Sequence, residues 1–167
     1  ISFENRTSPL NITQSPSPEG DGVDMVIITT EDLNDDFEQV ADYRTQQGII
    51  TVIRTVEWID QFYSGCDTPE RIRNFIRDAH EEWGIQAVLL GGDDGIVPVR
   101  ECKGWAYSTP DHPTYQLPSD DYYADIDGEW IEYSFSIGYY WLASETDNYL
   151  DLCAGRWPVD DGDDVDL

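Results

Sequence analysis

The chain has 167 residues and carries 9 Lys and Arg against 35 Asp and Glu, which gives a formal net charge of −26. A surface this acidic repels nucleic-acid phosphates and anionic lipid head groups, and no apolar run approaches the roughly 20 residues of a membrane span. We therefore expect no nucleic-acid partner and no membrane span. The 40% of hydrophobic and 13% of aromatic residues predict a folded domain. The acidity suits either a protein that works in high salt or an acidic extracellular protein.

Residues 1–23 are predicted to be a leader or linker, and residues 24–167 a folded unit. The leader is rich in Pro, Gly, Ser and Thr and lacks a periodic apolar pattern. It contains two Asn-x-Thr sequons, at Asn5 and Asn11, which permit export. The acidic residues 160–167 look like the opening turn of a helix, so we expect the unit to be truncated there.

Short apolar runs alternate with amphipathic segments in the first half of the folded unit. Residues 25–28, 49–53 and 87–90 are rich in β-branched or aliphatic side chains and predict three buried strands. Between the first two strands, apolar residues recur at helical spacing until Gly48. Residues 58–63 are expected to be a short connection. This order predicts an α/β fold with an open, mostly parallel sheet and helices on both faces.

The second predicted helix has the clearest start signal in the chain. Thr68 is the expected N-cap, Pro69 takes the first helical position and Gly84 ends the helix. Arg73 and Arg77 are expected mostly on the solvent side. The residues expected on its apolar face are Ile72, Phe75, Ile76, Ala79 and Trp83.

The second half of the chain is less regular. Four prolines in residues 95–119 predict a long loop. Alternating apolar and polar residues over 130–141 predict an inserted β-hairpin, and residues 148–154 predict one more strand.

A run of acidic residues over 119–129 is a candidate calcium loop. Asp125, Asp127 and Glu129 are the proposed ligands, because Ca²⁺ takes six to eight oxygens and Asp-x-Asp-Gly places two carboxylates on a sharp turn. An EF-hand would need a glutamate where the sequence has Ser136. Two interpretations stay open: a different structural calcium loop, or a turn whose aspartates accept hydrogen bonds from their own backbone. No cofactor is required by either.

Ligands of open α/β sheets bind outside the carboxyl ends of the strands. The third predicted strand ends in Gly-Gly-Asp-Asp at residues 91–94. We expect Asp93 to position the following loop by accepting backbone hydrogen bonds, with a cation site as the alternative. Walker, Gly-x-Gly-x-x-Gly, Gly-x-Ser-x-Gly, His-Glu-x-x-His and Cys-x-x-Cys motifs do not occur in the sequence.

The thiols and imidazoles do not form an obvious catalytic pair. Cys66, Cys102 and Cys153 cannot all pair within the chain, so no disulfide framework is expected. A cysteine nucleophile needs an imidazole within hydrogen-bond reach. His80 is expected on the polar side of a helix and His112 in the proline-rich loop, while Cys153 is expected to be a small buried hydrophobe. The predicted set of catalytic residues is therefore empty.

Six short segments, taken in order, resemble the sequence pattern of the gingipain family of cysteine peptidases, a caspase-like α/β group of exported enzymes. These segments are residues 24–29, 43–48, 68–76, 83–93, 118–128 and 154–159. Their order and spacing look like the N-terminal subdomain of the catalytic domain, from Asp24 to the C-terminus. Family members carry a His-Gly and the nucleophilic Cys in a second subdomain downstream. The hairpin over 130–141 is an insertion relative to the family pattern.

The resemblance implies a non-catalytic subdomain of a secreted or cell-surface cysteine endopeptidase. Its partners would be the downstream catalytic subdomain of the same chain and a peptide or protein substrate, whose binding residues stay unknown. The face prepared for the second subdomain should be apolar, so self-association is expected. The alternative is a binding or structural module of a cell-surface protein that keeps the fold without peptidase activity.

Overall fold

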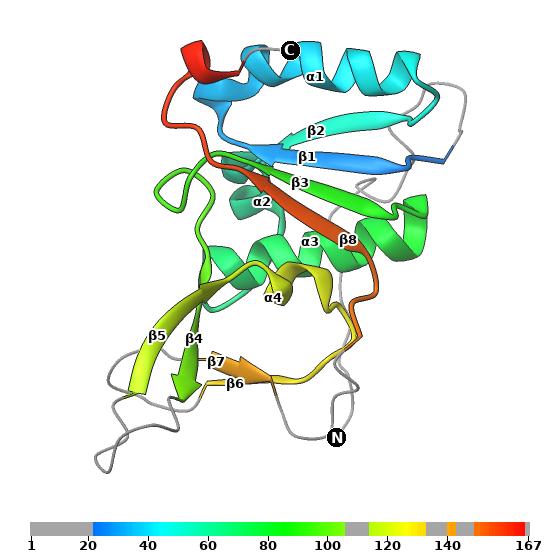
Figure 1. Ribbon diagram of the computed structural model, residues 1–167. Helices are drawn as coiled ribbons and strands as arrows, with labels where there is room; N and C mark the ends of the chain where they lie inside the picture. The colour runs from blue at the N-terminus through cyan, green and yellow to red at the C-terminus, as the bar shows by residue number, and fades with distance from the viewer. Residues whose placement is uncertain (1–21, 106–113, 133–139, 143–148, 166–167) are drawn as a thin grey trace.

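The main sheet of the computed structural model has four parallel strands in the order β2-β1-β3-β8 (Figure 1). These strands are β1 (Met25–Thr29), β2 (Thr51–Thr55), β3 (Ala87–Gly91) and β8 (Cys153–Trp157). The structure describes residues 22–105, 114–132, 140–142 and 149–165. The sheet confirms the predicted α/β fold, since parallel neighbours require crossover connections that lie over the faces of the sheet.

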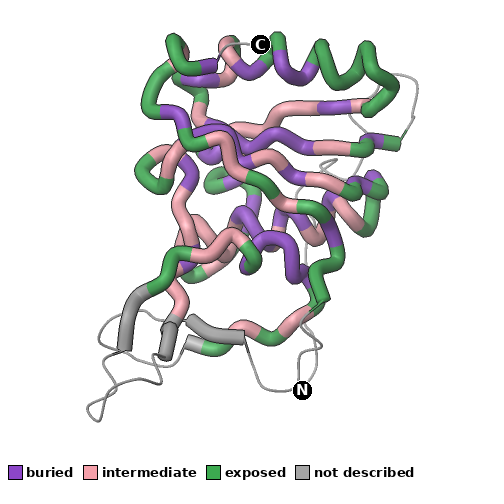
Figure 2. Tube along the Cα trace, viewed as in Figure 1, coloured by how far each residue is buried: buried purple, intermediate pink, exposed green. Residues whose placement is uncertain are grey.

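Helices cover both faces of this sheet, with α1 on one face and α2, α3 and α4 on the other (Figure 1). They are α1 (Asn34–Gln46), α2 (Val56–Phe62), α3 (Thr68–Trp83) and α4 (Asp121–Ala124). Alternate residues of a strand point to opposite faces. Val26 and Ile28 therefore join the larger core under α2, α3 and α4, whereas Ile27 joins the smaller core under α1. Figure 2 shows the buried parts of the chain in purple between the helical layers. Within the described residues, none of the helices is long and apolar enough to cross a bilayer.

The start of α3 differs by one residue from the prediction. Asp67 is the N-cap: its backbone is extended, and its Oδ1 accepts from the backbone N–H of Glu70 at 3.0 Å. Thr68 is therefore the first helical residue, and Pro69 is the second rather than the first. A carboxylate accepts this bond, and its negative charge is stabilised by the positive end of the helix dipole. Gly84 ends the helix as predicted, with a φ of 81° that favours glycine.

The prediction that Arg73 faces solvent is wrong. The residue is only 7% exposed, because the loop between α4 and the next strand packs across α3. Its guanidinium donates to the carbonyl oxygen of Asp125 at 3.0 Å and to that of Gly128 at 2.7 Å. Arg77 donates to the carbonyl of Ile126 at 2.9 Å. Both guanidinium groups therefore bond to carbonyl groups of this loop and hold it against α3.

The predicted long loop over residues 95–119 is also wrong, because two strands lie in it. A second sheet has the order β5-β4-β7-β6, with β4 (Arg100–Trp105) antiparallel to β5 (Thr114–Ser119). Pro118 lies in β5, an edge strand, where a residue without an N–H donor is tolerated. The predicted hairpin is confirmed where described: β6 (Trp130–Glu132) pairs antiparallel with β7 (Tyr140–Leu142).

Three further elements differ from the sequence prediction. The expected connection over 58–63 is largely helix α2, whose N-cap Thr55 accepts from the N–H of Trp58 at 3.2 Å. The last strand, β8, begins later than the predicted strand over 148–154: its pairing with β3 starts at Cys153, and Tyr149 and Leu150 before it are 77% and 54% exposed. The expected terminal helix turn is a 3-10 turn, η2 (Gly162–Asp164).

Candidate functional site

The carboxyl ends of β1, β3 and β8 meet at one edge of the main sheet, where α/β proteins bind ligands. The hydroxyl of Thr29 donates to the carbonyl of Gly91 at 2.7 Å and ties β1 to β3. Oδ1 of Asp93 accepts from the backbone N–H groups of Gly95 and Ile96 at 2.9 and 3.1 Å. These bonds confirm that Asp93 positions the loop after β3.

Arg156 clamps this edge to α4. Its Nε and Nη2 donate to the two carboxylate oxygens of Asp120 at 2.8 and 2.7 Å. Its Nη1 donates to the carbonyls of Gly92, Asp93 and Val97 at 2.9, 2.9 and 2.7 Å. Each nitrogen of the guanidinium is thus engaged within the protein. Arg156 therefore holds two loops in place, and its charge is neutralised by Asp120.

A shallow cavity of about 310 Å³ lies beside the clamp. Its lining residues are Asp93, Asp94, Val99, Pro118, Asp120, Arg156 and Pro158. A hydrogen bond with Asp93 raises the pKa of the exposed Asp160 carboxyl, as expected where two carboxyl groups approach each other. The described residues that line the cavity include three carboxyl groups and Arg156, and no thiol or imidazole is among them.

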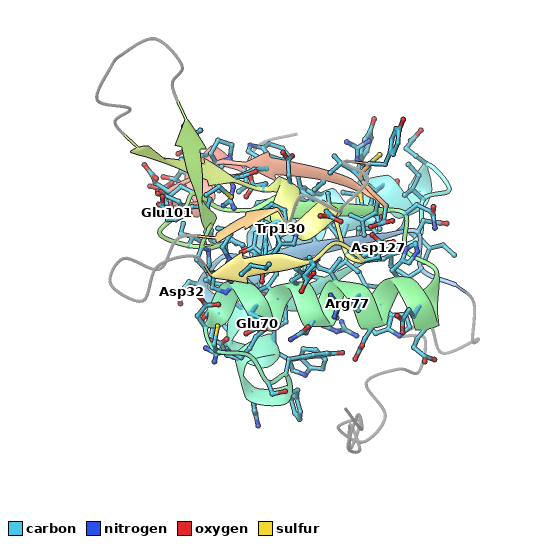
Figure 3. The ribbon with its side chains drawn as sticks, turned by 90° about the horizontal axis from the view of Figure 1, so that it is seen from below. Asp32, Glu70, Arg77, Glu101, Asp127 and Trp130 are labelled. Atoms are coloured by element: carbon cyan, nitrogen blue, oxygen red, sulfur yellow. The ribbon has the colours of Figure 1, made fainter. Side chains whose placement is uncertain are left out.

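The structure separates one predicted calcium ligand from the other two. Asp125 and Asp127 lie together with Asp151, and one ligand atom from each falls within 4.8 Å of the others. Glu129 is exposed and does not belong to this group. Figure 3 places Asp127 near Arg77 of α3, and both residues line a cavity of about 590 Å³. Asp151 is far away in sequence, and no local pattern indicated it.

The carboxylates of this loop accept hydrogen bonds from nearby N–H groups. Asp125, 5% exposed, accepts from the N–H of Gly128 at 2.9 Å and from the indole of Trp130 at 2.8 Å. Oδ2 of Asp151 accepts from the N–H groups of Ile126 and Asp127 at 2.9 and 3.3 Å. The bond from Gly128 to Asp125 is of the kind expected for a turn whose aspartate accepts from its own backbone, whereas the others come from the Trp130 side chain or go to the distant Asp151.

Calcium binding by this loop stays a prediction, and a thermal titration tests it. A bound ion would stabilise the folded state by a free energy of RT ln(1 + [Ca²⁺]/Kd). The melting temperature would therefore rise with the Ca²⁺ concentration. Asp127→Asn should remove that increase, and Glu129→Gln should keep it, since Glu129 stands outside the group. A melting temperature that neither Ca²⁺ nor a chelator changes would contradict calcium binding by this loop.

An ion pair between the buried Arg100 and the half-buried Asp67 joins β4 to the start of α3. Nη1 and Nη2 of Arg100 donate to Oδ2 and Oδ1 of Asp67 at 2.8 and 2.9 Å, and Nη2 also donates to the hydroxyl of Tyr122 at 3.2 Å. Burial opposes ionisation of Asp67, but the bonds from Arg100 and from the N–H of Glu70 hold its pKa below the usual value. Burial likewise disfavours the charged Arg100, but bonding to Asp67 raises its pKa.

The structure shows the exposure of each cysteine and the bonding of the described histidine. Nδ1 of the half-buried His80 donates to the carbonyl of Ile85 at 2.8 Å, so the main chain orients this ring. Cys66 is exposed, and burial raises the pKa of the half-buried Cys102 thiol to about 11. The prediction that Cys153 is buried is wrong: it is exposed, because β8 is an edge strand of the main sheet. His112 lies outside the described residues.

Solved structures with a similar fold come from proteases and a latent dimer. The complex of Porphyromonas gingivalis RgpB pro- and mature domains has a TM-score of 0.57 at 22% identity, with 85% of this chain and 26% of that chain covered. Dimeric latent PorU from Porphyromonas gingivalis has 0.58 at 18% identity, covering 87% and 15%. A structure described as a protease has 0.57 at 12%, covering 86% and 26%. At these identities the likeness shows the fold, and the chain spans about a quarter or less of each.

The match to a family model is more specific. A comparison with curated proteins found no match. The model of peptidase family C25, in contrast, matches residues 19–167, almost the whole chain and all of its described elements. The matched region contains the parallel sheet, both helical layers and the Arg156 clamp. The chain therefore belongs to peptidase family C25, the gingipain family.

Proposed function

We propose that this chain is the non-catalytic N-terminal subdomain of an exported, gingipain-like cysteine endopeptidase. One observation carries the proposal. An α/β active site is expected at the carboxyl edge of the main sheet. There the described residues supply the hydroxyl of Thr29, the guanidinium of Arg156, which is already bonded to Asp120, and carboxylates. Hydrolysis by a cysteine peptidase needs a thiolate and an imidazole that takes its proton. The proposal assigns both groups to the part of the polypeptide that follows this subdomain.

The positions of the described thiols support this assignment. Cys153 begins β8 and pairs in register with Ala87, at the amino end of the sheet and opposite the candidate edge. Cys66 precedes the N-cap of α3. The raised pKa of Cys102 keeps that thiol protonated near neutral pH, which makes it a poor nucleophile.

In the proposed enzyme, a downstream thiolate attacks the peptide carbonyl, and the histidine that accepted its proton returns a proton to the leaving amine. Water then hydrolyses the acyl-enzyme and releases the carboxylic acid product. The subdomain described here would flank the cleft, with its acidic edge beside the substrate. Export is part of the proposal by analogy with the family; the sequons at Asn5 and Asn11 are compatible with it.

Proteolysis assays on two polypeptides test the proposal. The chain of residues 1–167 is expected to leave casein intact under reducing conditions, and the longer natural polypeptide is expected to hydrolyse it and to lose activity with iodoacetamide. As a control, replacing Cys66, Cys102 and Cys153 together with serine should leave the activity of the longer polypeptide intact. Activity of residues 1–167 that disappears in this triple variant would overturn the proposal. An inactive longer polypeptide would instead favour the binding or structural module.

A further inference from the structure

Arg54 is a half-buried cation in β2, an outer strand of the main sheet (Figure 1). Its Nη1 donates to the carbonyl of Ile53 at 2.7 Å, whereas its Nε is closed to solvent and has no hydrogen-bond partner in the described structure. Burial lowers the pKa of Arg54, and the nearby phenol of Tyr63 opposes this shift only in part. The chain has 35 Asp and Glu residues, yet none of those in the described ranges forms an ion pair with Arg54.

Trp83, at the end of α3, brings a second donor without an acceptor to the same place. The residue is 5% exposed, and its indole Nε1 is buried with no hydrogen-bond partner among the described residues. Cζ of Arg54 lies 5.2 Å from the centroid of the Trp83 ring and 5.2 Å from that of Trp58 in α2. Phe75 contacts both indoles edge to face, at centroid distances of 6.0 and 5.8 Å, and so fixes their positions.

The contacts within the chain account for only part of this arrangement. A charged side chain on an outer strand opposes pairing with another strand, which explains an arginine at this position of β2. The indole rings attract the cation electrostatically. Neither contact supplies an acceptor for Nε of Arg54 or for the indole of Trp83, and a buried N–H without an acceptor loses its hydrogen bonds to water. The two donors therefore favour an acceptor from outside the described chain.

The donors select the chemistry of that acceptor. Nε and Nη2 of an arginine lie parallel along one edge of the guanidinium, and a carboxylate has two oxygens at the matching spacing. Its further lone pairs are available to the indole N–H of Trp83. A halide offers one atom and does not match two parallel donors. Sulfate and phosphate carry more charge than a carboxylate, and a chain with a net charge of −26 repels them more strongly.

We infer that Arg54 and Trp83 form a binding site for a carboxylate on the β2 side of the domain, with Trp58 stacked on the guanidinium. Arg54 and Trp58 are both half-buried, so solvent reaches the cluster. The site is separate from the candidate edge, since β2 and β8 lie at opposite sides of the main sheet. The inference goes beyond the proposed function and does not depend on it.

Titration with sodium acetate, with sodium chloride keeping the ionic strength constant, provides the test. In proton–nitrogen NMR spectra, the indole N–H of Trp83, assigned with Trp83→Phe, and the Nε–H of Arg54 are expected to shift and to saturate, with half-saturation at or below about 10 mM. The melting temperature should rise by about 4 °C at about 100 mM acetate. Neutral acetamide should change neither. Signals that stay in place with acetate, or that move equally with acetamide or chloride, would overturn the inference.

Arg54→Met separates binding from a merely structural role. Without acetate, its melting temperature is expected to be unchanged or higher, because no carboxylate loses a counter-charge, and acetate should no longer raise it. Arg71→Met is the matched control: it removes a cation paired with Asp60 near the surface and should keep the full response to acetate. A decrease in melting temperature larger than that of the control, or a response to acetate that persists in Arg54→Met, would contradict the site.

A further pair of probes distinguishes the source of the carboxylate. Acetyl-alanyl-alanine carries it at a peptide C-terminus, and the corresponding amide is the neutral counterpart. Saturation by this peptide at or below the acetate concentration, without a response to the amide, would assign the site to peptide ends. Binding of acetate alone would assign it to small organic acids, and both results support a carboxylate site. None of these measurements uses peptidase activity, so failure of this inference and failure of the proposed function are distinguishable.

Discussion

Replacing Arg156 with methionine is expected to lower the free energy of unfolding by about 3–5 kcal/mol. The Arg156 and Asp120 side chains are 13% and 26% exposed, so the substitution leaves a half-buried carboxylate without its counter-charge. It also removes the donor that the carbonyls of Gly92, Asp93 and Val97 share. Unsatisfied buried acceptors add to the cost.

Urea denaturation at neutral pH measures this loss. Arg71→Met is the matched control, because Arg71 pairs with Asp60 at 2.6 Å but the two side chains are 26% and 36% exposed. That control should cost about 1 kcal/mol or less. Adding Asp120→Asn to Arg156→Met should recover part of the loss, since it removes the unpaired charge. A loss for Arg156→Met no larger than the control would contradict the role of the clamp.

The second large effect is expected at Asp67. Asp67→Ala removes both the N-cap of α3 and the carboxylate that Arg100 bonds twice, and Arg100 is only 4% exposed in its side chain. The Asp67 side chain is 39% exposed, so we expect a loss of about 2–4 kcal/mol in the free energy of unfolding, from the lost cap and from the buried guanidinium left without its counter-charge. Asp67→Asn keeps an N-capping side chain and removes only the charge, so it should recover roughly 1 kcal/mol of that loss. Equal losses in the two variants would show that the cap contributes nothing.

The same pair predicts a dependence of stability on pH. The pKa of Asp67 is lower in the folded chain than its ordinary value of about 3.9, so the folded state binds its proton less readily than the unfolded state does. The resulting stabilisation is complete above about pH 5 and is lost as the pH falls through the folded-state pKa. The stability difference between the unmodified chain and Asp67→Asn should therefore shrink between pH 6 and pH 3 in urea titrations. A constant difference over this range would contradict the ionised pair.

Arginines hold the long connection between β3 and β8 to the rest of the domain. Arg73 bonds the loop after α4, Arg100 joins β4 to α3, and Arg156 joins β8 to the start of α4. The chain has only nine Lys and Arg residues, compared with 35 Asp and Glu residues. With Arg77, which bonds the carbonyl of Ile126, four of these nine residues are buried or half-buried arginines that hold loops in place.

The first half of the fold follows from local sequence. The runs that became β1, β2 and β3 are apolar because both faces of a parallel sheet are covered, and the apolar stripe of α3 recurs at the helical period. Gly84 ends α3 in a conformation that glycine adopts without strain. Each of these signals involves residues within a few positions of one another, so it can be recognised without knowledge of the tertiary structure.

Only the tertiary structure placed the partners of the charged residues. Nothing near Asp120 in the sequence indicates Arg156, 36 residues away, and nothing near Asp127 indicates Asp151. Arg73 was expected in solvent because an arginine next to an apolar stripe is usually hydrated, but a distant loop supplies its acceptors. Hydrophobic periodicity reports burial along one element, whereas a hydrogen bond or ion pair depends on which elements meet. The sequence by itself therefore determined the layers of this domain, and the packing between layers decided which side chains form its clamps and its acidic site.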